Sequence, residues 1–134
     1  MRAVLDPNVI VSALLSPDGA PAQVLRAWGD GAFEMVVSPK LMTELERALS
    51  YPKIGARIEP RDSSELLEWL NRSAIHAADT HPPTVSSADP DDDYLIALAA
   101  GESAALVSGD KHLLALADEA PVFAPRRFLE SIAA

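Results

Sequence analysis

Acidic residues crowd one stretch of this chain, SADPDDDYLIALAA (87–100), where DPDDD (89–93) runs straight into an apolar segment. Asp89 fits the N-cap of a helix and Pro90 fits the first helical position. The helix dipole stabilises an acid in the first turn by about 0.3–1 kcal/mol, but like charges on one turn repel each other. Hard carboxylate oxygens are also the ligands that Mg²⁺ and Mn²⁺ prefer. The stretch therefore indicates either ordinary helix capping or a site for a divalent cation.

Asp92 is the acid of this stretch that best fits a cation site. It shares a helical face with Ile96 and Ala99, at i+4 and i+7, so its side chain is expected to turn toward the apolar side. Asp91 and Asp93 diverge from that direction, toward solvent or the edge of the site. Because a partly buried charge needs a partner, we favour a cation at Asp92 over capping alone.

Two more acids each follow an apolar, strand-like run. Asp6 comes directly after residues 2–5 (RAVL), and Asp110 comes shortly after residues 104–108 (AALVS). In a doubly wound sheet, ligands bind at the carboxyl ends of the strands, which is where both acids would lie. Either acid could instead cap the helix that follows it. We interpret Ser108 as the cap of a turn rather than as a ligand of a phosphate or of Asp110.

Glu44 lies in the middle of a helical pattern. Taken alone, it is best explained as a surface residue paired with Lys40 or Arg47, a contact worth about 0.2–0.5 kcal/mol. Glu46 lies on the opposite flank of the apolar stripe, so we expect it to face solvent. Glu44 becomes a candidate catalytic residue only when it is considered together with the other acids.

The elements that must position these acids alternate between strands and helices. Strand-like runs lie at residues 2–5, 33–37, 104–108 and 121–124, and helical patterns at residues 8–16, 21–31, 39–50, 61–74, 110–120 and 125–134. A further helix opens within DPDDD, after a proline-rich loop (79–87). Trp28 and Trp69 lie on helical apolar stripes and are expected in the core. The alternation predicts a single α/β domain over residues 1–134, a three-layer α/β/α sandwich with a central, mostly parallel sheet.

Composition narrows the function classes. The formal charge is −9, from 11 basic and 20 acidic residues, which argues against general electrostatic attraction to nucleic acid. It does not exclude an enzyme acting on nucleic acid, because bound cations invert the local field. The chain has no cysteine, which excludes disulfides and thiolate chemistry. No apolar run approaches the about 20 residues of a membrane span, and no cleavage site follows the apolar N-terminus, so we expect a cytoplasmic protein without a membrane partner.

Other phosphoryl chemistries fit less well. A phospho-acceptor module would need an aspartate after a central strand, and FEMVVSPK (33–40) offers none. A phosphatase with an aspartate nucleophile would need a second aspartate two residues after Asp6, where Asn8 stands. We find no P-loop, GxGxxG, GxSxG or zinc signature.

Three segments carry a family resemblance when they are taken together: VLDPNVIVSALLS (4–16), VSPKLMTELERALSYPKI (37–54) and DPDDDYLIALAAGESAALVSGDKHLL (89–114). In this order and at these intervals they resemble the PIN domain, close to the branch of toxins of toxin–antitoxin systems that is related to the VapC type. The resemblance covers nearly the whole chain. It implies a three-layer α/β/α fold with a central parallel sheet and the activity of a metal-dependent ribonuclease.

Carried over residue by residue, the resemblance implies that Asp6, Glu44, Asp92 and Asp110 are the catalytic acids. We expect Asp6 and Asp92 to hold Mg²⁺ or Mn²⁺ directly, and Asp110 to do so directly or through water. Glu44 would complete the site or orient the attacking water. Without a cation, like charges should raise the pKa of at least one of these acids.

The chain departs from the family pattern at Pro7, where a threonine or serine is usual. Proline removes a hydroxyl and a backbone N–H that could hold Asp6 or a nearby water, which leaves a second interpretation open: a catalytically weak PIN-fold module that binds RNA or a protein partner. Asp93 stands where asparagine or another polar residue is usual, and Asp89 is expected to support the site from a distance. The resemblance also implies RNA as substrate, a cognate antitoxin protein as partner, and a homodimer.

Overall fold

Five parallel strands form one central sheet in the computed structural model, which describes residues 1–79 and 92–133. The strands are β1 (Arg2–Leu5), β2 (Glu34–Val37), β3 (Ile75–His76), β4 (Ala105–Val107) and β5 (Val122–Phe123), in the order β3-β2-β1-β4-β5. The helices are α1 (Pro7–Leu15), α2 (Ala20–Gly29), α3 (Pro39–Leu49), α4 (Pro52–Gly55), α5 (Pro60–Ser73), α6 (Asp93–Gly101), α7 (Lys111–Leu114) and α8 (Pro125–Ala133).

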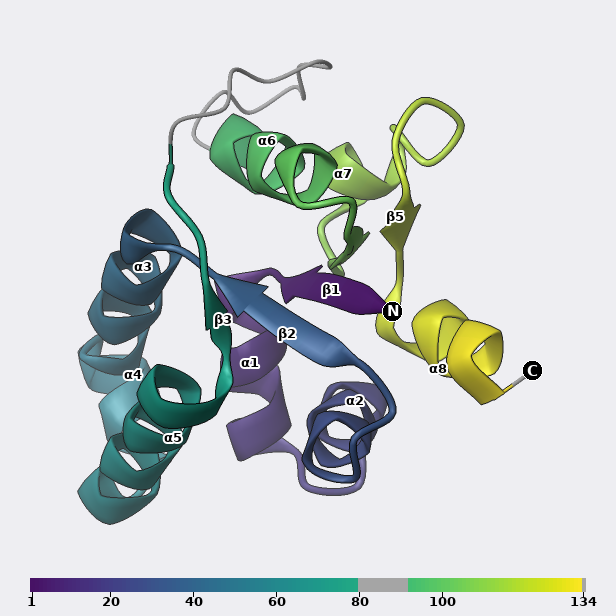
Figure 1. The fold of residues 1–134 in the computed structure, drawn as a ribbon. Coiled ribbons are helices and arrows are strands. Elements are labelled where there is room, and N and C mark those ends of the chain that lie inside the picture. Colours follow the sequence, from purple (N-terminus) through teal and green to yellow (C-terminus); the bar gives the residue numbers. More distant parts are fainter. Residues whose placement is uncertain (80–91, 134) are drawn as a thin grey trace.

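Helices cover both faces of the sheet (Figure 1). Helices α6 and α7 lie on one face, while α1, α2, α3, α5 and α8 lie on the other. Helix α1 packs against α2 and α3, and α8 packs against α2. The predicted α/β/α architecture is therefore confirmed, and every strand pairing among the described residues is parallel.

The central strand β1 is apolar because both of its faces are covered. Ala3, Val4 and Leu5 are almost completely buried, as expected for a strand inside a parallel sheet. Of the two tryptophans predicted in the core, Trp28 is buried and Trp69 is half-buried against it. Trp28 on α2 stacks on Trp69 of α5 with 4.2 Å between ring centroids.

Local capping chemistry sets the start of α3. Ser38 is its N-cap, and the hydroxyl of Ser38 accepts a hydrogen bond from the N–H of Leu41 at 3.2 Å. Pro39 occupies the first helical position, as its fixed φ favours. Both are residue types that the sequence shows to favour a helix start, and together they set where α3 begins after the end of β2.

The predicted elements are wrong at three places. The strand β3 and the short helix α4 were not predicted, because two- and four-residue elements carry no readable periodicity. The predicted helix 110–120 ends at Leu114 and continues as turns. Only Leu113 of α7 is buried, and such a short helix is marginal without more packing.

Several predictions fall outside the described residues: the loop beyond Asp79, the capping roles of Asp89 and Pro90, and the direction of Asp91. Within the described part of the chain, no helix is long and apolar enough to span a membrane.

Candidate active site

The chain order of the strands reverses between β1 and β4. From β1 the chain moves to β2 and β3 on one side, and it then returns to place β4 and β5 on the other. Ligands of doubly wound sheets bind in the crevice at the carboxyl ends of the strands on either side of such a reversal. Asp6 directly follows β1, and Ser108 directly follows β4. The N–H of Asp6 donates to the carbonyl of Val107 at 2.9 Å, which joins the two strand ends.

Asp6 is a buried carboxylate held by two donors. Its side chain is only 5% exposed. Oδ1 accepts the N–H of Asn8 at 3.0 Å, and Oδ2 accepts the hydroxyl of Ser108 at 2.8 Å. Burial raises the pKa of Asp6 above its usual range, against the two hydrogen bonds, and the charge of Asp110 raises that pKa further. An acid with a raised pKa was predicted, but burial rather than charge repulsion is the main cause.

Ser108 connects two of the predicted acids. Its fully buried hydroxyl donates to Asp6 and accepts the N–H of Asp110 at 3.0 Å. Asp110 in turn caps α7, with Oδ1 accepting the N–H of His112 at 2.7 Å. Our interpretation of Ser108 as a turn cap was incomplete, because the contact with Asp6 depends on the pairing of β1 with β4. The sequence alone does not predict that contact, because it requires Leu5 and Val107 to be paired in neighbouring strands.

A pocket of about 420 Å³ opens beside Asp6 at this edge of the sheet. Three of the four predicted acids line it: Asp6, Glu44 and Asp92. Its charged and aromatic lining is completed by Lys40, Arg47, Tyr51 and Tyr94. Asp110 lines a neighbouring pocket of about 320 Å³ instead, and Asn8 borders both. The structure thus gathers three acids in one pocket and ties the fourth to it through Ser108.

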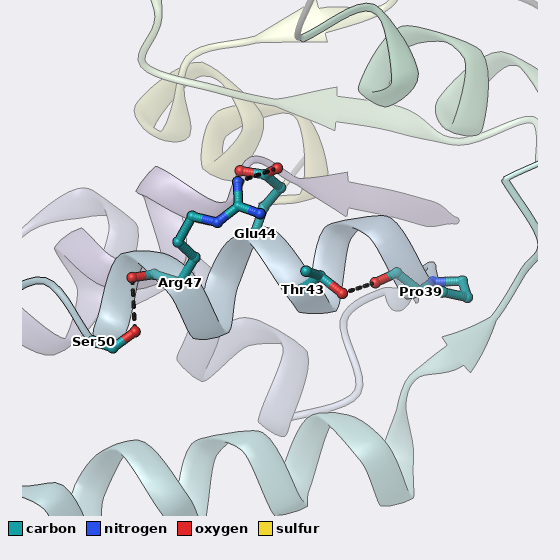
Figure 2. Close-up of polar contacts among 5 residues, drawn as sticks. All are labelled: Pro39, Thr43, Glu44, Arg47 and Ser50. Carbon is teal, nitrogen blue, oxygen red and sulfur yellow. Dashed lines mark hydrogen bonds and ion pairs between the residues drawn. The ribbon is translucent and has the colours of Figure 1, made fainter.

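Glu44 forms the surface ion pair that was expected of it when taken alone, and it also lines the pocket. Its Oε1 accepts Arg47 Nη1 at 3.2 Å, an ion pair one turn apart on α3 (Figure 2). The side chains are 38% and 59% exposed, so the pair is weak and can rearrange. Glu46 is exposed, as predicted, and does not line the pocket.

Asp92 stands at the N-cap position of α6 and is half-buried. Its side chain makes no capping hydrogen bond within the described residues, so helix capping does not account for it. Asp93, the first residue of α6, is also half-buried rather than turned fully to solvent. The position of Asp92 in the pocket agrees with the expected inward direction.

Tyr94 lies among the acids and was not singled out from the sequence. Burial, followed by the charges of Glu44, Asp6, Asp92 and Asp79, raises its pKa above the usual value. Burial and the surrounding charges thus further disfavour the ionised form of a hydroxyl that can donate a hydrogen bond. Its only sequence signal was its place directly after DPDDD.

The donors at this site fit a hard divalent cation in type. Carboxylate oxygens from Asp6, Asp92 and Glu44 face one pocket, and no sulfur or imidazole lies among its lining residues. Across the described ranges 1–79 and 92–133, however, no three acidic or histidine side chains lie close enough together to hold a metal ion. The donor chemistry is present, but a coordination sphere is not already assembled.

Comparison with known proteins gives two findings. A family model described as the PIN domain matches residues 2–112. The chain is also similar to an uncharacterized protein of Methanocaldococcus jannaschii, MJ1680, with 27% identity over 121 residues. That match spans 89% of this chain and 77% of the archaeal protein.

Proposed function

We propose, since this chain belongs to the PIN domain family, that it is a metal-dependent endoribonuclease that hydrolyses RNA phosphodiester bonds. The observation that carries the proposal is the pocket at the β1–β4 strand ends. Asp6, Glu44 and Asp92 come from three different parts of the chain and line this one pocket. Asp6 caps α1 and Glu44 pairs with Arg47, but these local contacts do not require the three acids to meet in one pocket.

Each acid has a distinct proposed role. Asp6 and Asp92 hold Mg²⁺ or Mn²⁺, and Asp110 contributes directly or through water. Glu44 leaves Arg47 to complete the site or to orient the attacking water. When bound, the cation supplies a hydroxide near neutral pH and offsets the charge of the phosphate. Ser108 acts through Asp6, because its hydroxyl fixes the direction of that carboxylate.

The test is cleavage of a mixed pool of structured and single-stranded RNAs by the purified protein. The reaction is run with Mg²⁺, with Mn²⁺ and with chelator, using the unmodified protein, Asp92→Asn and Asp62→Asn. Asp62 is a matched control, because it is an exposed acid in the first turn of α5. We expect metal-dependent cleavage that only Asp92→Asn loses. Equal cleavage by all three proteins, or cleavage that survives chelator, would contradict the proposal.

One observation favours a second candidate function, a PIN-fold module that binds RNA or a protein but cleaves poorly. Pro7 is buried beside Asp6, and the described acids do not already converge on an ion position. Thermal unfolding with added Mn²⁺ separates the two candidates. Binding to the folded state stabilises a protein by about 2.7 kcal/mol at one hundred times Kd, so a nuclease should show a clear shift and a module without metal none.

The toxin role and its partners form a finer part of the proposal. It rests on the resemblance to toxins related to the VapC type, and so does the expectation of a homodimer. The expectation of a cytoplasmic location rests instead on the lack of an apolar run long enough to span a membrane. A cognate antitoxin would cover the acidic pocket with a basic side chain, because that side chain would offset the acids there. Induced expression tests the role: the unmodified chain should arrest growth and Asp92→Asn should not. A tight antitoxin complex with no Arg or Lys near Asp92 would contradict the contact.

A further inference from the structure

One face of α3 and the residue just beyond its end form a continuous wall of the pocket. Lys40, Glu44, Arg47 and Tyr51 are spaced by four, three and four residues, which is the repeat of a helical face. All four line the pocket. Only Glu44 belongs to the proposed catalytic set. The ammonium of Lys40 lies over the ring of Tyr94, 4.7 Å from the ring centroid, and remains at the edge of the pocket. Arg47 and Tyr51 have no role in the proposed catalytic set.

Arg47 is a cation beside a pocket of acids in a chain with a charge of −9. Its guanidinium is 59% exposed and paired with Glu44 of its own helix (Figure 2). Exposed pairs of this kind contribute little to stability, so Arg47 can exchange Glu44 for another anion. A phosphate can accept two hydrogen bonds from a guanidinium, whereas the contact with Glu44 is a single hydrogen bond from Nη1 to Oε1 at 3.2 Å. The same exchange would release Glu44 for its catalytic role.

Tyr51 carries an exposed aromatic ring on a backbone that hydrogen bonds hold in place. Its side chain is 56% exposed, whereas the other aromatic side chains of the described ranges are buried or half-buried. Its backbone is held on both sides: the N–H donates to the carbonyl of Ala48 at 3.3 Å, and the carbonyl accepts the N–H groups of Ile54 and Gly55. Stacking on this ring would order only the two side-chain torsions of Tyr51, because its backbone is already held.

Accordingly, we infer that this wall binds the substrate of the proposed ribonuclease: Arg47, assisted by Lys40, holds a backbone phosphate, and Tyr51 stacks on an unpaired base. This inference rests on the proposed function for the identity of the ligand as RNA. Both residues are positioning residues, and the base must be unpaired because a base within a duplex presents no free face to a ring.

The net charge of the pocket predicts that RNA binding depends on the bound cation. Three carboxylates and two cations line it, which leaves one net negative charge. A divalent cation held by Asp6 and Asp92 would reverse that sign. RNA should therefore bind to the cation-loaded protein better than to the free protein.

The experiment measures binding rather than turnover. Fluorescence anisotropy of a short, labelled single-stranded oligouridylate is followed with Ca²⁺ in place of Mg²⁺, at several salt concentrations. The proteins are the unmodified chain, Arg47→Gln, Tyr51→Ala, Tyr51→Phe and the control Arg61→Gln. Arg61 is a matched control, because it forms a similar exposed ion pair with Glu65 on α5, outside the pocket. A duplex of the same length serves as a second probe.

The two residues should leave different signatures. Arg47→Gln should flatten the dependence of log Kd on log salt by about 0.7, the value of one phosphate contact on a single strand. Tyr51→Ala should weaken single-strand binding about tenfold without changing that slope, and Tyr51→Phe should restore it. Arg61→Gln should change neither quantity. In cleavage assays with Mg²⁺, Tyr51→Ala should raise KM about tenfold and leave kcat within about twofold.

Failure of this inference differs from failure of the ribonuclease proposal. If the unmodified chain cleaves RNA but Arg47→Gln and Tyr51→Ala bind it like Arg61→Gln, the wall is not the substrate surface and the inference is wrong. The same conclusion follows if Tyr51→Ala weakens duplex and single strand equally, or if the unmodified chain binds neither probe. If both variants bind as expected while no protein cleaves RNA with Mg²⁺ or Mn²⁺, the inference stands for a binding module and the ribonuclease proposal fails.

Discussion

Two walls of the pocket are built in opposite ways. The wall at the end of β1 is buried: Asp6 is 5% exposed and receives hydrogen bonds from Asn8 and Ser108. The wall along α3 is open, and Glu44 there is 38% exposed with Arg47 as a surface partner. One carboxylate is fixed by the fold, and the other is held by a contact that water can replace.

The buried wall can hold a ligand in one position, whereas the open wall can change its contacts when a ligand binds. A buried carboxylate cannot move without breaking hydrogen bonds that burial makes costly to lose, so Asp6 defines where a cation would lie. An exposed glutamate can change partner at little cost, so Glu44 and Arg47 can respond to a substrate. Substitutions on the two walls should therefore differ in their effects on activity and on stability.

The largest effect is expected for Asp6→Asn. Removal of a group that only supports a metal ligand costs about 10–100-fold in activity, and removal of a direct ligand should cost more. Asparagine keeps the shape and can still cap α1, so the fold should survive. RNA cleavage with Mn²⁺ measures the loss of activity, and circular dichroism checks that the variant is folded. A folded Asp6→Asn variant with unchanged activity would remove Asp6 from the site.

Ser108→Ala should have the next largest effect, and it should reduce both stability and activity. Loss of the hydroxyl leaves the buried carboxylate of Asp6 without one donor, at a cost of about 1–3 kcal/mol at neutral pH. As a residue acting through a ligand, Ser108 should also contribute about 10–100-fold to activity. Urea unfolding measures the change in the free energy of unfolding, and cleavage assays measure the change in activity. An unchanged free energy of unfolding would mean that water replaces the hydroxyl.

On the open wall, Glu44→Gln should reduce activity while stability hardly changes. The ion pair with Arg47 lies one turn apart on the helix surface, so its loss should cost about 0.2–0.5 kcal/mol. Glu46→Gln, on the same helix but outside the pocket, is the control and should change neither property. We expect about a tenfold fall in kcat for Glu44→Gln, the lower end of what supporting groups at metal sites contribute. Equal activity of the two variants would leave Glu44 as a surface residue.

The smallest effect concerns pH and the buried wall alone. The pKa of Asp6 is raised in the folded protein, so folding favours its protonated form. Its contribution to stability is fully present below the unfolded pKa of about 3.9 and is lost as pH rises through the higher folded value. With chelator present, Asp6→Asn should therefore be more stable than the unmodified chain at neutral pH, and the gap should close toward about pH 4. Denaturant titrations at neutral pH and near pH 4 measure the difference in the free energy of unfolding between the two proteins. A difference that grows on acidification would contradict the raised pKa of Asp6.

Much of the fold could be predicted from the sequence, because local rules act over a few residues. The apolar run of β1, the Ser38–Pro39 start of α3 and the alternation of strands with helices all depend on neighbours in the chain. The four candidate acids could be named as a set only through the family resemblance, because Glu44 taken alone is best explained as a surface residue. The two-residue strand β3 could not be predicted, since its pairing with β2 rather than its own sequence defines it.

Only the tertiary structure decided which residues meet. The hydrogen bond from Ser108 to Asp6 joins positions 102 residues apart and exists because β4 returns to lie beside β1. The tertiary structure also brings Asp92 and Glu44 into one pocket and places Tyr94 within reach of the charges of four acids. The sequence alone determined which chemistry was available, because residue types and local periodicity carry it. The order of the strands decided where that chemistry gathers, because packing over long separations brings the side chains together.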